Sequence, residues 1–214
     1  MLKAFVSFSG GKDSHLSIYK AKETGFEVQA LLSMVQEDEK HSASHHIPVD
    51  VLRRQSAAMG IPLFVYPTSW ETYEINFLRA LKELKEKGIT SGIFGDIDVL
   101  EHREWVERVC QKAGIDPLLP LWGKDHKEVA EEVVHLGFEA YITVVKDGVL
   151  PQEYLGRRYN KALIEELLSR GVDPCGEEGE FHTLVTFGPL YRHPVSCTFS
   201  GYGFDGKYHF LEVR

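Results

Sequence analysis

Apolar positions along the chain alternate between short continuous runs and helically spaced sets. Lys3–Phe8 and Phe26–Val35 are nearly continuous in apolar residues, a pattern typical of strands covered on both faces. The stretch between them, Asp13–Thr24, has a helical pattern, and Gly25 is expected to end it. The chain is therefore predicted to open with a strand, a helix and a second strand.

The same alternation continues as far as residue 113. Helices are predicted at Pro48–Met59, Glu71–Lys87 and Glu101–Ala113, and strands at Leu63–Tyr66 and Ile89–Ile97. A polar, Ser- and His-rich segment, Gln36–Ile47, is expected to be a loop. Strands and helices that alternate at this spacing indicate βαβ units with right-handed crossovers. The predicted fold class is α/β with a doubly wound parallel sheet.

The pattern changes after Trp122. Helices are predicted at His126–Leu136 and Tyr159–Arg170, and strands at Glu139–Val145, Phe181–Phe187, Val195–Gly201 and Lys207–Val213. Asp205-Gly206 is a strong hairpin signal, so the last strands are expected to be antiparallel. We predict a larger domain, residues 1–122, and a smaller α+β domain, residues 123–214, packed around a cleft.

Composition and charge narrow the class of protein. The formal net charge of -8 argues against a general nucleic-acid binder, which needs clustered Lys and Arg. No apolar run reaches the ~20 residues of a membrane helix, and no secretory signal is visible at the start. Cys110, Cys175 and Cys197 are too far apart to suggest a disulfide framework or a zinc pair, so a reducing cytoplasm is expected.

The strongest chemical signal is the segment Ser9-Gly10-Gly11-Lys12-Asp13-Ser14, which lies between a predicted strand and a predicted helix. Two glycines allow a tight turn and let backbone N–H groups approach an oxyanion. The helix start adds free N–H groups and the positive end of its dipole, and Lys12 adds a full charge. Such a loop can bind phosphate or pyrophosphate. The alternative is a simple turn in which Asp13 caps the helix.

This loop lacks the Walker A pattern and resembles the pyrophosphate loop (PP-loop) of the N-type ATP pyrophosphatases, whose signature is Ser-Gly-Gly-x-Asp-Ser. The resemblance implies a doubly wound parallel sheet of the adenine nucleotide α-hydrolase type. It also implies that ATP is cleaved between its α- and β-phosphates to adenylate a substrate. Mg²⁺ is expected on the phosphates.

Further segments resemble one branch of that superfamily, the diphthine–ammonia ligases. They are Val6–Ser14, Ser44–His46, Phe94–Ile97, Pro120–Trp122 and Gly171–Val185, and they span nearly the whole chain. The most specific contains Gly-Glu-x-Gly-Glu-Phe-His-Thr, whereas Ser44-His45-His46 lacks the aromatic residue of the family's second motif. The resemblance implies that ATP, ammonium and diphthine on elongation factor 2 give diphthamide, AMP and pyrophosphate through an acyl-adenylate.

The resemblance also implies residue roles. The nucleotide is expected at Ser9, Gly10, Gly11, Lys12, Asp13 and Ser14, with Ser33, Met34, Gly95 and Asp96 at neighbouring strand ends and Asp13 as the Mg²⁺ ligand. The catalytic candidates are Lys12, Asp13, Glu180 and His182, and the substrate side comprises Glu177, Glu178, Glu180, His182 and Thr183. If this last segment is extended, Glu178, Glu180 and His182 share one face. The alternative is a solvated acidic loop.

Two other functions stay open. One is a different PP-loop ATP pyrophosphatase that modifies RNA or a small molecule, although the chain has neither a basic face nor extra cysteine pairs. The other is a module that binds ATP or AMP without turnover, which the intact Lys12-Asp13-Ser14 and the acidic segment disfavour. The sequence also leaves open the ammonia source and a homo-oligomer.

Overall fold

A parallel five-stranded sheet forms the first half of the computed structural model, which describes residues 2–43 and 45–214. Its strands are β1 (Leu2–Ser7), β2 (Phe26–Val35), β3 (Leu63–Pro67), β4 (Ser91–Ile93) and β5 (Asp116–Leu118), in the spatial order β3-β2-β1-β4-β5. All neighbouring strands pair in parallel. The predicted doubly wound α/β fold is thereby confirmed.

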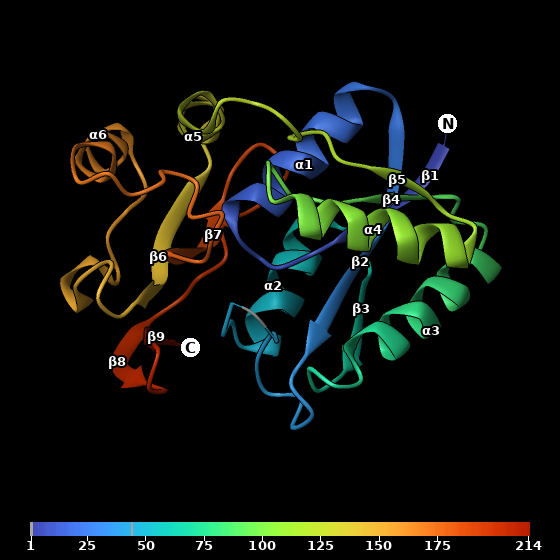
Figure 1. Cartoon of the computed structure of the whole chain (residues 1–214), viewed down its shortest axis with the longest axis horizontal. Coiled ribbons are helices and arrows are strands. Elements are labelled where there is room, and N and C mark those ends of the chain that lie inside the picture. The colour runs from blue at the N-terminus through green and yellow to red at the C-terminus, as the bar shows by residue number, and fades with distance from the viewer. Residues whose placement is uncertain (1, 44) are drawn as a thin grey trace.

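Helices cover both faces of this sheet (Figure 1). They are α1 (Lys12–Glu23), α2 (Val49–Met59), α3 (Tyr73–Glu86) and α4 (Leu100–Ala113). Apolar side chains of α3 and α4 pack on the sheet face that carries Phe5 and Leu32. Those of α1 and α2 pack on the opposite face, which carries Val6 and Leu31. The central strands β1 and β2 thus bury both of their faces over successive residues, which explains their continuous apolar runs.

The second half forms an antiparallel sheet. Its strands are β6 (Glu139–Lys146), β7 (Phe181–Phe187), β8 (Phe199–Phe204) and β9 (Tyr208–Val213), in the order β7-β6-β9-β8. Helices α5 (His126–His135) and α6 (Lys161–Ser169) and the short 3-10 helix η1 (Gln152–Tyr154) accompany it. The hairpin predicted at Asp205-Gly206 joins β8 to β9.

The two sheets share one continuous apolar core. Val6 and Leu16 from the parallel half belong to the same buried cluster as Ile142 and Leu184 from the antiparallel half. In Figure 1, α1 and β7 lie side by side at this junction, in agreement with their direct contacts. The proposed domain boundary between residues 122 and 123 stays a prediction.

Three strand predictions need correction. β5 was missed, because its three residues include Pro117 and are too few to show a period. The strand expected over Ile89–Ile97 is only Ser91–Ile93. The strand expected from Val195 begins at Phe199, because the bond from the Val195 N–H to the carbonyl of Thr186 in β7 is not continued as a strand ladder. Among the helices of the described residues, none is both long and apolar enough to traverse a bilayer.

Candidate active site

The predicted phosphate loop lies at the switch point of the parallel sheet. β1 has β2 on one side and β4 on the other, and the chain leaves the carboxyl ends of β1 and β4 in opposite directions. Open α/β sheets bind ligands in the crevice that forms at such a point. The loop that follows β1 meets the segment that follows β4 here, and a Cβ on Gly95 would lie only 3.2 Å from the backbone of Asp13. Gly95 therefore permits the close approach.

The loop itself has the conformation that its glycines predict. Gly10 has φ +82°, and a Cβ at this position would lie 2.8 Å from a methyl group of Leu52. The hydroxyl of Ser9 accepts a hydrogen bond from the Gly11 N–H at 3.2 Å, and the hydroxyl of Ser14 donates to the Gly11 carbonyl at 2.9 Å. These bonds hold the first turn of α1 with its N–H groups at the crevice, where an anion is stabilised.

Two elements from elsewhere in the chain fix the loop. The carbonyl of Gly10 accepts the Val185 N–H of β7 at 3.1 Å and the side-chain amide of Gln55 of α2 at 2.9 Å. The same amide donates to the Val185 carbonyl at 2.7 Å. The Thr183 hydroxyl accepts the backbone N–H of Lys12 at 3.1 Å. The antiparallel half thus completes the phosphate loop, and buried Gln55 joins the three segments.

Lys12 is buried, with 2% of its side chain exposed, beneath the loop. Its ammonium donates to the Asp13 carboxylate at 2.8 Å and to the Cys175 carbonyl, and it lies over the rings of Tyr159 at 5.6 Å and Phe181 at 5.4 Å. Burial alone would lower the pKa of Lys12, but the charge of Asp13 and the hydrogen bonds raise it above its ordinary value. The side chain therefore places a permanent positive charge at the cavity.

Three carboxylates line the cavity near this ammonium, and one of them, Asp13, is paired with it. Asp13, Asp96 and Glu177 all line the cavity, and within the described residues the buried Oδ1 of Asp13 has no hydrogen-bond partner. Burial, together with the charges of Asp13 and Asp96, raises the pKa of Glu177 to about 7. Carboxylate oxygens are the ligands that Mg²⁺ prefers. The unpartnered Oδ1 of Asp13, with Asp96 lining the same cavity, fits a divalent cation.

His126 and Asp173 hold the turn that carries Glu177 in place. The imidazole of His126, at the start of α5, contacts the carboxylates of Asp98 at 3.0 Å and Asp173 at 2.7 Å. Asp173 in turn accepts the backbone N–H groups of Cys175 at 2.9 Å and Glu177 at 2.8 Å. The turn that carries Glu177 is therefore tied to the segment after β4.

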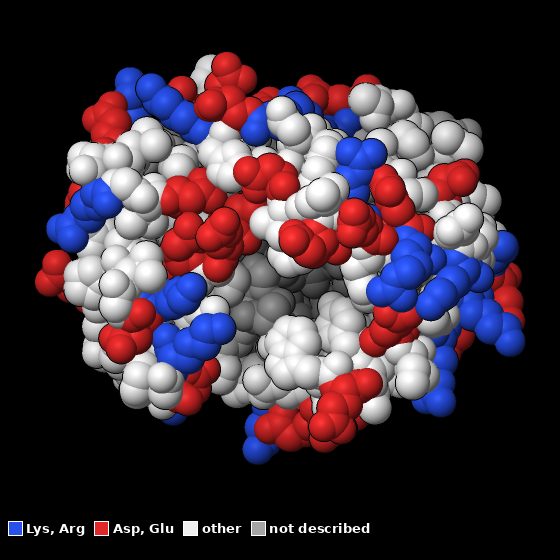
Figure 2. Space-filling model, in the orientation of Figure 1, with Lys and Arg blue, Asp and Glu red and all other residues white. Residues whose placement is uncertain are grey.

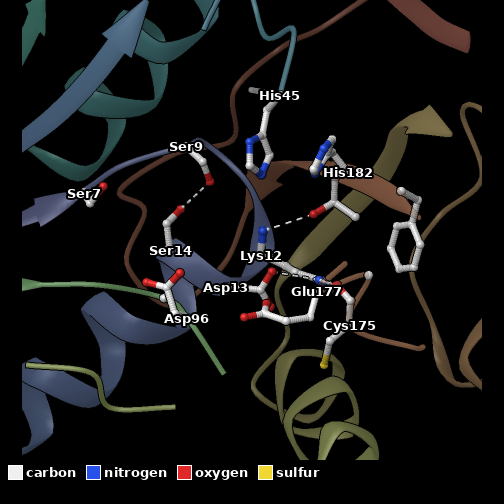
Figure 3. A pocket seen from close by; sticks show the side chains of 14 residues that line it. Ser7, Ser9, Lys12, Asp13, Ser14, His45, Asp96, Cys175, Glu177 and His182 are labelled. Carbon is white, nitrogen blue, oxygen red and sulfur yellow. Dashed lines mark hydrogen bonds and ion pairs between the residues drawn. The ribbon is translucent and has the colours of Figure 1, made fainter. Parts of the chain in front are cut away.

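Two imidazoles form the opposite wall. The ring of His45, from the loop after β2, lies against the ring of His182 on β7 with centroids 4.2 Å apart (Figure 3). Burial lowers the pKa of His45 well below its ordinary value and that of His182 to about 4. Both rings are neutral near pH 7, and so are compatible with a nearby cation. The third residue of the predicted histidine motif, Ser44, lies outside the described residues.

These groups enclose a cavity of about 240 Å³. Figure 2 shows a hollowed face of the molecule with acidic side chains along much of its rim. Of the residues predicted from the sequence, the cavity is lined by Ser9, Lys12, Asp13, Ser14, Gly95, Asp96, Glu177, His182 and Thr183. Figure 3 shows the carboxylates on one side of Lys12 and the imidazoles on the other. The structure therefore brings the phosphate loop and the acidic segment together.

Ser33 and Met34 do not line this cavity. The hydroxyl of Ser33 donates to the carbonyl of Phe8 at 2.6 Å, and the carbonyl of Met34 accepts the N–H of Ala43 at 3.0 Å. Both side chains are buried at the carboxyl end of β2. Their contact with adenine stays a prediction.

The expectation that Glu178, Glu180 and His182 share one face is wrong. Gly176 and Gly179 have φ +69° and +79°, so the segment turns before β7 begins instead of being extended. Glu178 is exposed, and neither it nor Glu180 lines the cavity. The turn presents Glu177 to the cavity in their place.

Sequence reasoning missed Gln55 and gave His45 no defined role. Gln55 had a signal, because it falls on the apolar face of α2 with Leu52 and Met59, where a buried amide must find partners. His45 had none, because its approach to His182 depends on the path of the irregular segment after β2.

Comparison with known proteins agrees with this geometry. Residues 2–117 match the family model of the diphthamide synthase N-terminal domain, and residues 125–211 match that of the diphthamide synthase C-terminal domain. The chain belongs to the diphthamide synthase family. The first matched region contains the phosphate loop, and the second contains Glu177, His182 and Thr183.

Relatives of this diphthamide synthase family chain include proteins named diphthine--ammonia ligase. The one from Danio rerio is 29% identical, over 87% of this chain and 83% of that protein. Those from Homo sapiens and Schizosaccharomyces pombe are 30% and 26% identical, over 87% and 92% of this chain and 79% and 36% of theirs. A solved structure described as a predicted subunit of tRNA methyltransferase from Methanocaldococcus jannaschii has a TM-score of 0.48 at 17% identity, covering 88% of this chain and 98% of that one. At that similarity it carries no argument about function.

Proposed function

We propose that this chain is a diphthine–ammonia ligase, which uses ATP and ammonium to convert diphthine on elongation factor 2 into diphthamide, with AMP and pyrophosphate as products. The observation that carries the proposal is the meeting of the two matched regions in one cavity, where Thr183 bonds to the phosphate loop and Glu177 faces Asp13. An ATP loop and an acidic segment joined in this way suit the activation of a carboxylate beside a second, nitrogenous substrate.

The proposed reaction has two steps. A carboxylate oxygen of diphthine attacks the α-phosphorus of ATP, and pyrophosphate leaves to give the acyl-adenylate. Ammonia then attacks the acyl carbon, AMP leaves, and the nitrogen loses a proton to form the amide. In both steps the residues act by positioning and by stabilising charge. The first-turn N–H groups of α1, the hydroxyls of Ser9 and Ser14 and the ammonium of Lys12 would stabilise charge on the phosphates.

We assign the metal-binding role to Asp13 and Asp96. When bound, Mg²⁺ would neutralise charge on the phosphate oxygens. The unpartnered Oδ1 of Asp13 supports this assignment. Asp13 was already the metal ligand predicted from the sequence, and Asp96 lines the same cavity.

Glu177 is the residue best suited to handle the proton of ammonium. Ammonium must lose a proton before its nitrogen can attack, and a base works best when its pKa lies near the operating pH. The pKa of Glu177 is about 7, whereas that of His182 is about 4. We therefore give Glu177 the acid–base role, and His182 a place in the substrate wall. Glu180 does not line the cavity, so we give the acid–base role to Glu177 instead of to Glu180.

The remaining assignments follow the same proposal. Residues 1–122 would form the ATP-binding part and residues 123–214 the substrate side. Elongation factor 2 would dock over the hollowed face. The free cysteines Cys110, Cys175 and Cys197 support a cytoplasmic location.

The test is incubation with diphthine-bearing elongation factor 2, ATP, Mg²⁺ and ammonium, followed by mass measurement of the modified histidine and assay of AMP and pyrophosphate. We expect amide formation matched by one AMP per amide. Asp13→Asn should abolish it, whereas Asp147→Asn, an exposed carboxylate on the β6 turn, should leave it unchanged. Tight ATP binding without turnover on this substrate would refute the proposal.

A further inference from the structure

A second cavity of about 630 Å³ adjoins the first. His182 lines both cavities, so this one side chain separates the phosphate loop from the second space. The second cavity is bounded by the loop after β2, by Trp70 after β3 and by the β8–β9 hairpin. A substrate that approached from this side would pass His182 before it reached the α-phosphate position.

Ring faces dominate the lining of this second cavity. Trp70, Tyr208 and Phe210 contribute aromatic rings, and His46 and His182 contribute imidazoles. His46 lies on Phe210 with ring centroids 4.0 Å apart, and His182 and Tyr208 lie 6.3 Å apart. Trp70 stacks on Tyr73 with ring centroids 5.7 Å apart but is still 74% exposed, so most of its indole surface is open to a ligand.

The charges at the cavity suit a cation. The carboxylate of Asp205 lies at the rim, held by the backbone N–H groups of Lys207 at 2.9 Å and Tyr208 at 2.7 Å. The bond from Tyr208 is the main cause that lowers the pKa of Asp205, so this carboxylate stays ionised. Burial lowers the pKa of both His46 and His182, so neither imidazole opposes a positive ligand near pH 7.

The chain already shows how this wall receives an ammonium group. The Nζ atom of Lys207 lies over the ring of Tyr208, 5.0 Å from its centroid. Lys207 is exposed, and its flexible stem can move into solvent when another cation takes its place. Cations over the faces of aromatic rings are stabilised by about 1 kcal/mol at exposed sites and by ~2 kcal/mol when desolvated.

From this arrangement we propose that the second cavity binds a quaternary ammonium group, with Trp70, Tyr208 and Asp205 as its recognition residues. The inference rests on the proposed function. Diphthine carries a trimethylammonium group on the carbon next to the carboxylate that reacts. A quaternary ammonium cannot donate a hydrogen bond or lose its charge, so ring faces and a nearby carboxylate are what can recognise it. With the carboxylate in the loop cavity, the ammonium falls on the His182 side, toward these rings.

The probe for this site is 2-(trimethylammonio)butanoate, which reproduces the reacting end of diphthine. Its matched control is 2-tert-butylbutanoate, which has the same shape and the same carboxylate but no positive charge. Both are tested as inhibitors of amidation of diphthine-bearing elongation factor 2. We expect the charged probe to inhibit at a concentration about tenfold lower. Equal inhibition by the two compounds would overturn the proposal.

Variants then locate the effect. Tyr208→Leu, Trp70→Ala and Asp205→Asn should each remove most of the tenfold preference and raise KM for the protein substrate, while the Kd for ATP stays unchanged. Asn at position 205 still offers an oxygen to the turn, so the hairpin should survive. Tyr202→Leu, an aromatic residue of β8 that is 59% exposed and lines neither cavity, is the control.

The two proposals fail in different ways. Wild-type protein that makes no diphthamide would refute the proposed function. Active wild-type protein with unchanged KM and unchanged probe preference in all three variants would refute the ammonium site alone.

Discussion

Replacement of Glu177 by Gln tests the electrostatics of the cavity. The Glu177 carboxylate accepts the Ile97 N–H at 2.8 Å, and a Gln oxygen can accept the same bond. The variant therefore removes the ability to ionise and keeps the contact. Burial is the main reason that the pKa of Glu177 rises from 4.5 to about 7 in the folded state.

The sign and size of the effect follow from that shift. Between the two pKa values the folded protein binds more protons at Glu177 than the unfolded chain, so this residue lowers stability as pH rises through that range. At ~1.4 kcal/mol per pH unit, a rise in pKa from 4.5 to about 7 corresponds to about 3 kcal/mol. Because Glu177 borders a cavity open to solvent, we discount this to about 2 kcal/mol.

The contribution of Glu177 to stability is measured by urea unfolding of wild type and Glu177→Gln at about pH 5 and about pH 8, without Mg²⁺ or nucleotide. Relative to wild type, the free energy of unfolding of Glu177→Gln should increase by about 2 kcal/mol between the two pH values. The amidation rate of this variant should fall ~100-fold, because an acid–base group is removed. Glu178→Gln, at the exposed neighbouring position, should do neither. A pH-independent difference between Glu177→Gln and wild type would show that the carboxylate is not held at a raised pKa.

Three further predictions address the loop and its wall. Thr183→Val should leave the buried Lys12 N–H unpaired, cost ~1–3 kcal/mol in urea unfolding and weaken ATP binding, whereas Thr183→Ser should not. Gly10→Ala should abolish ATP binding measured by calorimetry, because its Cβ meets Leu52. Gly25→Ala, at φ +87° with nothing within 4 Å of the added Cβ, should cost only the left-handed strain. Because burial lowers the pKa of His182 to about 4, its own contribution to stability should rise with pH from about 4 to 6.5, opposite in sign to that of Glu177. His182→Gln should therefore make stability rise less, or fall more, than in wild type over this range by roughly 1–2 kcal/mol; equal slopes would refute it.

Much of the fold was predictable because local pattern and global structure agree. The continuous apolar run of β2 reflects helices on both faces of the sheet, and the strand has the predicted bounds, Phe26–Val35. The phosphate loop was predictable for the same reason, since Gly10 needs a positive φ and the helix begins directly after Gly11. In these segments one stretch of sequence contains the whole physical cause.

The rest of the site depends on contacts that no local pattern contains. The role of Glu177 comes from a turn set by Gly176 and Gly179, which an assumed extended strand concealed. The second cavity needs Trp70, which follows β3 of the parallel sheet, and Tyr208, which begins β9 of the antiparallel sheet. Periodicity predicts which face of an element is buried, but it does not predict which distant face it will meet.

The bond between Lys12 and Thr183 joins residues 171 positions apart. During synthesis the loop leaves the ribosome first, whereas β7, which holds it through Thr183 and Val185, is made only after the residues between them. A nascent chain shorter than β7 thus carries an unfinished nucleotide site. ATP binding would then report that translation has passed β7, and a ribosome stalled earlier would display a chain that cannot bind the nucleotide.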